Sequence, residues 1–230
     1  MSWRVALIDS CGSWPRARAS AAFARTDRGI ECRAPVVDPT GHGSRIAALL
    51  TAGDDAMELL LGQVFLNAEP TSAAAVAAAL DWSLSCGARL VHLSLGIARD
   101  RPVLGDAVRE AVAAGAIIVA STPARGVTAF PASYPGVIQA TGDARCAPGE
   151  ISRLAPMRFG GCPRPSPALA GHTEATPVRG GASIGAAWVS KAIVSLQPAA
   201  STADVVKALN ACAIYCGPER RGTPTAIGSS

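Results

Sequence analysis

The sequence predicts an α/β fold in which a mostly parallel central sheet is flanked by helices, giving three layers. Short apolar runs alternate with amphipathic segments along most of the 230 residues, which is typical of strands connected by helices. Hydrophobic residues make up 49% of the chain and charged residues only 17%, which argues against disorder. Aromatic residues, at 4%, leave the packing to Ala, Val, Leu and Ile, which suits helices laid closely on a parallel sheet. With no repeat and no linker in sight, residues 1–230 are expected to form one compact domain.

The first half of the chain alternates strands and helices in a regular order. Thr71 and Ser72 can accept hydrogen bonds from the free amides at the start of an alanine-rich helix, and Gly87 can end it. The predicted strands are residues 5–8, 31–37 and 58–66, and the predicted helices run from His42 to about Leu50 and from Ser72 to Ser85.

The second half continues the alternation and then becomes irregular. Gly115 is suited to close a helix, and residues 142–181 are rich in Pro, Gly and Arg, which indicates long loops with short strands. The predicted strands are residues 89–95, 116–121 and 137–141, and the predicted helices are residues 103–114, the segment after Ser183 and residues 202–212.

Three segments are expected to meet at one edge of the sheet. Asp9 follows the first strand, residues 94–96 lie at the carboxyl end of the strand over residues 89–95, and residues 122–126 follow the next strand. Because functional groups gather beyond the carboxyl ends of parallel strands, we expect a site at this edge.

Ser183 lies in a small-residue turn, Gly180-Gly-Ala-Ser, that opens an apolar helical run. The glycines permit a tight turn and close approach of a substrate backbone. A serine at a helix N-terminus also has free amides and the positive end of the helix dipole beside it, which stabilise a developing oxyanion. Taken alone, the motif also fits an ordinary serine near a helix cap.

A serine nucleophile requires a base, and the base requires an acid that holds its tautomer. His42, in Gly41-His-Gly-Ser44, is flanked by glycines and is poorly suited to core packing. His92 falls inside a predicted strand and is expected to be a satisfied core residue, and His172 is expected to be solvated. Asp9 ends an apolar strand, where a buried carboxylate needs a partner such as His42. The resulting chain order is Asp, His, Ser.

These motifs resemble those of the subtilase family of serine proteases. Gly41-His-Gly-Ser is similar to the family's Gly-His-Gly-Thr, and Asp9-Ser-Cys-Gly12 to its Asp-Ser/Thr-Gly. The segment around Ser183 is similar to Gly-Thr-Ser-Met-Ala-x-Pro-His, with several exchanges. Residues 91–96 and 130–138 resemble two further family blocks. The resemblance implies a subtilisin-like catalytic domain in which Ser183 attacks a peptide carbonyl, His42 transfers the proton and Asp9 orients His42. It also implies that an extended substrate pairs with Ser94, Leu95 and Gly96.

One departure concerns the oxyanion. Where the family has Gly-Asn, whose amide donates to the oxyanion, this chain has Pro123-Ala124. Three outcomes are left open: a slow enzyme that relies on the Ser183 N–H, a donor supplied by Thr122, Arg125 or a partner, or a catalytically silent protein.

Composition limits the partners and the compartment. The net charge is +4, but the basic residues are scattered without interleaved aromatics, so no nucleic-acid partner is predicted. No apolar run reaches the roughly 18 residues of a membrane helix, so no membrane partner is predicted. The seven cysteines are odd in number, irregularly spaced and without a Cys-x-x-Cys pair, which favours free buried thiols. No metal or cofactor is predicted, and Asp54-Asp55 is interpreted as a surface pair.

The sequence therefore predicts a cytoplasmic serine endopeptidase that cleaves a dedicated peptide or small protein substrate. The small size and many cysteines further resemble the subtilases that remove the leader peptide during maturation of the quinohemoprotein amine dehydrogenase small subunit. That resemblance implies a cross-linked, cysteine-containing subunit and its maturation enzymes as partners. The alternative is a catalytically silent module of the same fold that binds a peptide or acts as a chaperone.

Overall fold

The computed structural model describes residues 3–53, 57–67, 70–127, 129–164, 181–197 and 201–218. Ten strands of these residues form one sheet in the order β10-β8-β9-β7-β6-β5-β1-β4-β2-β3. The strands are β1 (Arg4–Asp9), β2 (Ala17–Thr26), β3 (Gly29–Arg33), β4 (Glu58–Gln63), β5 (Leu90–Leu93), β6 (Ile117–Ser121), β7 (Ile138–Gly142), β8 (Ile151–Ala155), β9 (Arg158–Gly161) and β10 (Ala213–Cys216). The helices are α1 (His42–Thr51), α2 (Ala73–Ser85), α3 (Pro102–Ala113), α4 (Ala182–Leu196) and α5 (Thr202–Cys212).

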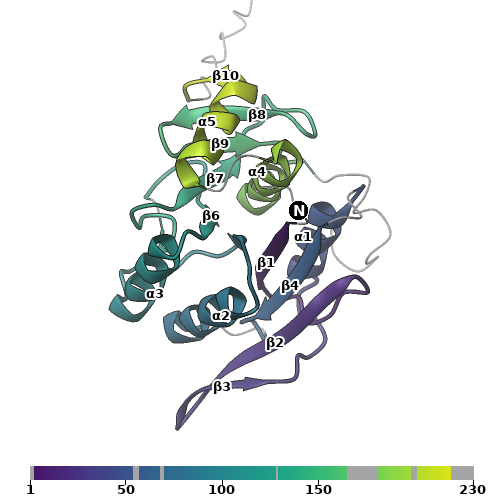
Figure 1. The fold of residues 1–230 in the computed structure, drawn as a ribbon, viewed down its shortest axis with the longest axis vertical. Helices are drawn as coiled ribbons and strands as arrows, with labels where there is room; N and C mark the ends of the chain where they lie inside the picture. Colours follow the sequence, from purple (N-terminus) through teal and green to yellow (C-terminus); the bar gives the residue numbers. More distant parts are fainter. Residues whose placement is uncertain are drawn as a thin grey trace, which may run out of the picture.

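The predicted three-layer α/β fold with a mostly parallel sheet is confirmed. Only the β2–β3 and β8–β9 pairs are antiparallel among the paired strands of the described residues. One hydrophobic cluster joins one face of the sheet to α1, α4 and α5, and a second joins the other face to α2 and α3. Figure 1 shows the β2–β3 hairpin at one end of the sheet and β10 at the other.

Local sequence explains most of the helix ends. The Ser72 hydroxyl accepts a hydrogen bond from the Ala75 amide at 3.1 Å and so caps the start of α2. Gly87 follows the end of α2 with φ +80°, a conformation that favours glycine. At the start of α5, Ser201 and Asp204 form a reciprocal capping box.

The β2–β3 hairpin was not predicted. Residues 17–26 include five alanines, which have a weak β propensity, so the pattern gives no strand signal. Tertiary contacts impose the extended conformation on these residues. β2 pairs with both β4 and β3, and Phe23 packs against Trp82 with ring centroids 5.9 Å apart. The prediction of a strand over residues 31–37 is correct only as far as Arg33, since Pro35 has no amide to donate to a sheet.

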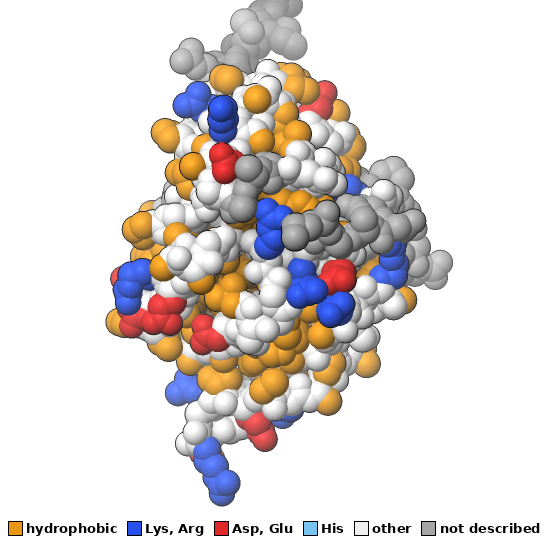
Figure 2. Space-filling view, in the orientation of Figure 1, with side chains coloured by type: hydrophobic (Ala, Val, Ile, Leu, Met, Phe, Trp, Pro, Cys, Tyr) orange, Lys and Arg blue, Asp and Glu red, His pale blue; other side chains and the backbone are white. Residues whose placement is uncertain are grey.

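Charged side chains are spread over the surface. Figure 2 shows Lys and Arg in separate groups over one face, with acidic side chains among them. In the part of the chain that the structure describes, no helix is long and apolar enough to cross a membrane.

Candidate functional site

Asp9 and His42 are in direct contact at the carboxyl edge of the sheet. Asp9 is the last residue of β1 and is 2% exposed, while His42 is the first residue of α1. The Nδ1 atom of His42 lies 2.9 Å from Oδ1 of Asp9. A buried carboxylate in this position fixes the ring so that its Nδ1 carries the proton and Nε2 is free to accept one.

The Asp9 carboxylate raises the pKa of His42 above its ordinary value. The negative charge of Asp9 is the largest cause, and burial of the ring opposes it. The Asp9 hydrogen bond acts in the same direction as the charge. His42 therefore binds a proton more readily than a solvated histidine, which suits a general base.

Ser10 connects the carboxylate to the start of α1. Its amide and hydroxyl both donate to Oδ1 of Asp9, at 2.6 and 3.1 Å. Its hydroxyl oxygen accepts the Gly43 amide at 2.9 Å. Gly43 has no room for a side chain, because a β-carbon there would lie 2.3 Å from the Cys11 amide nitrogen. This close approach of α1 to the end of β1 holds the Asp9–His42 geometry.

Asp38, which was not among the predicted site residues, organises the turn before His42. Its Oδ1 accepts the amides of Thr40 and Gly41 at 3.1 and 2.9 Å, and its Oδ2 accepts the amide and hydroxyl of Ser44 at 2.8 and 2.7 Å. Burial raises the pKa of Asp38, but the hydrogen bonds from Ser44, Ser10 and Thr40 together outweigh burial and hold the pKa below its ordinary value. The signal was present in the sequence, since an Asp four residues before a predicted helix is a typical turn and cap residue.

Replacing Asp38 with alanine is expected to reduce the free energy of unfolding by about 1–2 kcal/mol, as for loss of a helix cap. The reason is that the Thr40, Gly41 and Ser44 amides lose their acceptor. Urea denaturation measures the change, and Asp27→Ala, in the exposed β2–β3 turn, is the matched control. Equal stability of the Asp38→Ala variant and the wild type would contradict this role.

Ser183 lies in the first turn of α4 and is half-buried. Gly185, two residues further, packs directly on β7, where a β-carbon would lie 2.3 Å from the Thr141 carbonyl oxygen. The Gly181 amide donates to the Pro163 carbonyl oxygen at 2.9 Å. These contacts fix the start of α4 at the same edge of the sheet as Asp9.

The helices that carry His42 and Ser183 pack against each other. The Lys191 ammonium on α4 donates to the carbonyl oxygens of Leu49 and Ala52 at the end of α1, and the two helices share one hydrophobic cluster. In the described residues, however, no hydrogen bond joins the Ser183 hydroxyl to the His42 ring. The structure thus joins Asp9 to His42 but leaves Ser183 outside that hydrogen-bonded pair.

A hollow of about 360 Å³ lies at the start of α4, and of the expected oxyanion residues Thr122, Ala124 and Ser183 only Ala124 lines it. Arg158 donates to the carbonyl oxygens of Pro123 and Ala124, at 2.6 and 3.4 Å, and so holds this loop. Thr122 is 1% exposed, and its hydroxyl has no partner among the described residues. The residues lining the hollow are Ala124, Arg125, Gly142, Ala144, Pro163, Gly181 and Ala182.

The expected substrate-binding segment lies on a neighbouring strand end. Because β1, β5 and β6 are adjacent and parallel, they end at the same edge, where Asp9 ends β1, Ser94 follows β5 and Thr122 follows β6. Ser94 and Leu95 are buried, whereas Gly96 is exposed. Ile97 forms a two-way backbone bridge with Phe130, at 2.7 and 2.9 Å.

The remaining candidates have ordinary surroundings or lie outside the described residues. His92 is fully buried, its Nδ1 lies 2.8 Å from the Ser190 hydroxyl, and burial lowers its pKa to about 4. It is a core residue, as expected, but it is not fully satisfied, since its Nε2 is buried with no hydrogen-bond partner among the described residues. All seven cysteines are free, but only Cys11, Cys146 and Cys162 are fully buried, so the expectation of buried thiols is correct for these three alone. His172 and Asp54-Asp55 lie outside the described residues.

Comparison with known proteins supports the fold. No protein-family model matches the chain, and no curated protein matches it. Among solved structures, the prenylagaramide maturation protease PagA is similar with a TM-score of 0.58 and 15% identity, over 85% of this chain and 75% of that one. A lanthipeptide protease is similar with a TM-score of 0.49 and 20% identity, over 60% of this chain and 47% of that one. This chain thus matches about half of the length of the lanthipeptide protease.

The expectation of a subtilase of quinohemoprotein amine dehydrogenase maturation is wrong on these findings. No family model and no curated protein matches the chain, and a similar solved structure is a prenylagaramide maturation protease. The physical reason lies in the motifs themselves. Segments such as Gly41-His-Gly are short. Their glycines permit tight turns and close packing, which many unrelated proteins require. Such segments predict geometry better than they predict membership of a family.

Proposed function

We propose that this protein is a serine peptidase that cleaves a dedicated precursor peptide, with Asp9, His42 and Ser183 as its catalytic residues. The observation that carries the proposal is the 2.9 Å contact between buried Asp9 and the His42 ring, on a helix that packs against the helix of Ser183. The fold shared with a prenylagaramide maturation protease supports a precursor peptide as substrate.

In this mechanism His42 Nε2 accepts the proton of the Ser183 hydroxyl as its oxygen attacks the scissile carbonyl. Asp9 stabilises the imidazolium that forms. The protonated His42 then gives its proton to the leaving amine. In the second half of the reaction His42 accepts a proton from water, whose oxygen attacks the acyl carbonyl, and returns the proton to the Ser183 oxygen as the acyl group leaves. The hydrogen bond between Ser183 and His42 forms in the substrate complex, since catalytic hydrogen bonds of free enzymes often tighten only there.

The Ser183 amide at the start of α4 donates to the oxyanion. Ala124 has no side-chain donor, so the developing charge receives less stabilisation than a side-chain amide would add. A slow peptidase is compatible with a single substrate that is held in place by binding along Ser94, Leu95 and Gly96. The main chain of an extended peptide would bind there by strand addition.

Replacing Ala124 with asparagine is expected to raise kcat by about tenfold or more, because one oxyanion donor contributes about 10²–10³ in kcat in enzymes that have it. The change is measured as kcat on a peptide that the wild type cleaves. Ala124→Asp has nearly the same shape without the amide donor and should give no gain. An unchanged kcat in the asparagine variant would mean that the oxyanion already has its second donor.

The cysteines support a reducing compartment, since seven free thiols are typical of the cytoplasm. We propose a cytoplasmic protein that acts as one catalytic domain and requires no metal or cofactor for this mechanism.

A mixture of synthetic peptides of varied sequence, analysed by mass spectrometry, tests the proposed function. Wild-type protein is expected to cleave a small subset of the peptides at one preferred bond, and Ser183→Ala is expected to cleave none. Binding of peptides without cleavage by the wild type would instead favour the silent module, which the lack of a hydrogen bond between His42 and Ser183 keeps as the second candidate.

A further inference from the structure

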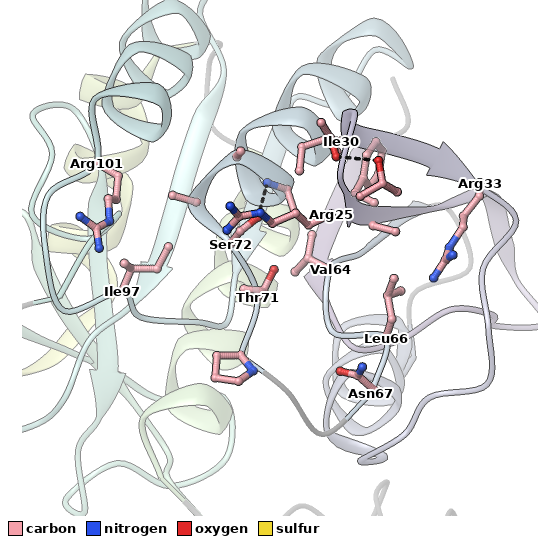
Figure 3. Close-up of a pocket in the computed structure, with 18 of the residues that line it drawn as sticks. Arg25, Ile30, Arg33, Val64, Leu66, Asn67, Thr71, Ser72, Ile97 and Arg101 are labelled. Carbon is pink, nitrogen blue, oxygen red and sulfur yellow. Dashed lines mark hydrogen bonds between the residues drawn. The ribbon is translucent and has the colours of Figure 1, made fainter.

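A large groove lies beside the β2–β3 hairpin and outside the Asp9–His42 pair. It has a volume of about 1000 Å³. One wall is the hairpin, and the other is formed by the residues after β4, the start of α2 and the segment that contains Ile97 and Arg101. Figure 3 shows Arg25 and Arg33 on the hairpin side and Arg101 beside Ile97. We call this feature the hairpin groove.

The hairpin groove carries an excess of positive charge. Arg25, Arg33 and Arg101 line it and are exposed, and Asp27 is the one acidic residue in its described lining. Within the described parts of the chain, none of these three guanidinium groups is paired with a carboxylate. Elsewhere on the molecule Arg4 is paired with Glu58 at 2.8 Å and Arg145 with Asp143 at 2.7 Å. The unpaired arginines are therefore available to carboxylates of a ligand.

The backbone of the hairpin is suited to an extended ligand. β4 pairs with β2 only as far as Ala22, so residues 23–26 pass the end of β4 with β3 as their one paired neighbour among the described strands. An extended peptide can add to such an edge through main-chain hydrogen bonds. Val64, Leu66 and Ile97 supply apolar contacts along the same groove.

The groove lining includes the residue that follows the proposed substrate segment in the sequence. Ile97 lines the groove and directly follows Ser94, Leu95 and Gly96, where the substrate would lie. A peptide that extends beyond this segment past Ile97 enters the space between Arg101 and the hairpin.

We propose that the hairpin groove binds an extended, carboxylate-bearing segment of the precursor peptide. This inference rests on the proposed function and names its substrate class: peptides with several Asp or Glu residues to one side of the scissile bond. The arginines select the acidic segment, and the edge of β2 holds its main chain. Binding of the acidic segment away from the cleaved bond would then compensate for the missing side-chain donor at the oxyanion.

The test measures binding, so that it does not depend on catalysis. Fluorescein-labelled ten-residue peptides of alternating Glu-Ala, Gln-Ala and Lys-Ala are titrated by fluorescence anisotropy against full-length Ser183→Ala protein. The Glu-Ala peptide is expected to bind at least tenfold more tightly than the Gln-Ala peptide in low salt, with the difference shrinking as salt screens the charges. Equal affinities of these two peptides would overturn the proposal.

Charge reversal locates the site. Arg25→Glu combined with Arg33→Glu is expected to weaken Glu-Ala binding about tenfold and to create binding of the Lys-Ala peptide, a gain that a misfolded protein cannot show. Arg28→Glu makes the same kind of charge change in the same hairpin but outside the groove lining, and should leave the affinity within about twofold, as for exposed charges. Unchanged binding by the double variant would place the acidic peptide elsewhere. Because no cleavage is measured, acidic-peptide binding would survive even if the peptidase proposal failed.

Discussion

The His42→Ala variant is expected to lose about 10⁶-fold in kcat, as when the base of a Ser-His-Asp triad is removed. The physical reason is that the Ser183 hydroxyl then has no group to accept its proton, and the leaving amine has no group to protonate it. The Asp9 carboxylate is also left buried without its imidazole partner. The loss is measured as the rate of cleavage of the preferred peptide under saturating conditions.

The control for this variant must separate catalysis from folding. His42 is partly exposed at the start of α1, and its side chain contributes little to the core. His42→Gln keeps a polar side chain of similar size and should show the same rate loss with an unchanged urea midpoint. A kcat within tenfold of the wild type in either variant would contradict the role of His42 as general base.

The Asp9→Asn variant is expected to lose about 10⁴-fold in kcat, because asparagine keeps the shape of aspartate but no longer fixes the productive tautomer of the ring. It also removes the charge that raises the pKa of His42. A neutral His42 is needed as base, so the rate falls as pH drops through its pKa. The midpoint of this acid limb should lie above about 6.5 in the wild type and move to lower pH in the variant.

The pH profile distinguishes this role from a structural one. Asp106→Asn removes an exposed carboxylate of α3 that is paired with Arg109, far along the chain from His42. This control should leave both kcat and the acid midpoint unchanged. If the midpoint were the same in Asp9→Asn and in the wild type, the Asp9 charge would have no influence on the catalytic base.

Much of the fold could be predicted because the sequence pattern and the tertiary structure agree there. The apolar strands β1, β5 and β6 are continuous runs bounded by turn residues, and α2 has both of its end signals in Ser72 and Gly87. β2 is different, because its alanines have no strand preference of their own and the pairing of β4 and β3 imposes the extended form. β10 directly follows α5 and was also missed.

The candidate site was predictable where glycines and strand ends mark it. Asp9 and His42 were selected from such local signals, and the structure places them 2.9 Å apart. Asp38 was missed although its partners Thr40, Gly41 and Ser44 are local, whereas Gln63 was missed because its role depends on residues distant in the chain. Gln63, for example, is fully buried and donates to the carbonyl oxygens of Ser10 and Val36 at 2.8 and 3.0 Å. No pattern in the sequence connects these three residues.

Reaction with a fluorophosphonate probe, followed by mass spectrometry of the labelled peptide, tests most directly that Asp9, His42 and Ser183 act as one unit. We expect a single adduct on the Ser183 oxygen, formed at least 10³-fold more slowly in His42→Ala because the serine then lacks its base. Labelling of a different residue, or labelling of Ser183 at the same rate with and without His42, would contradict it.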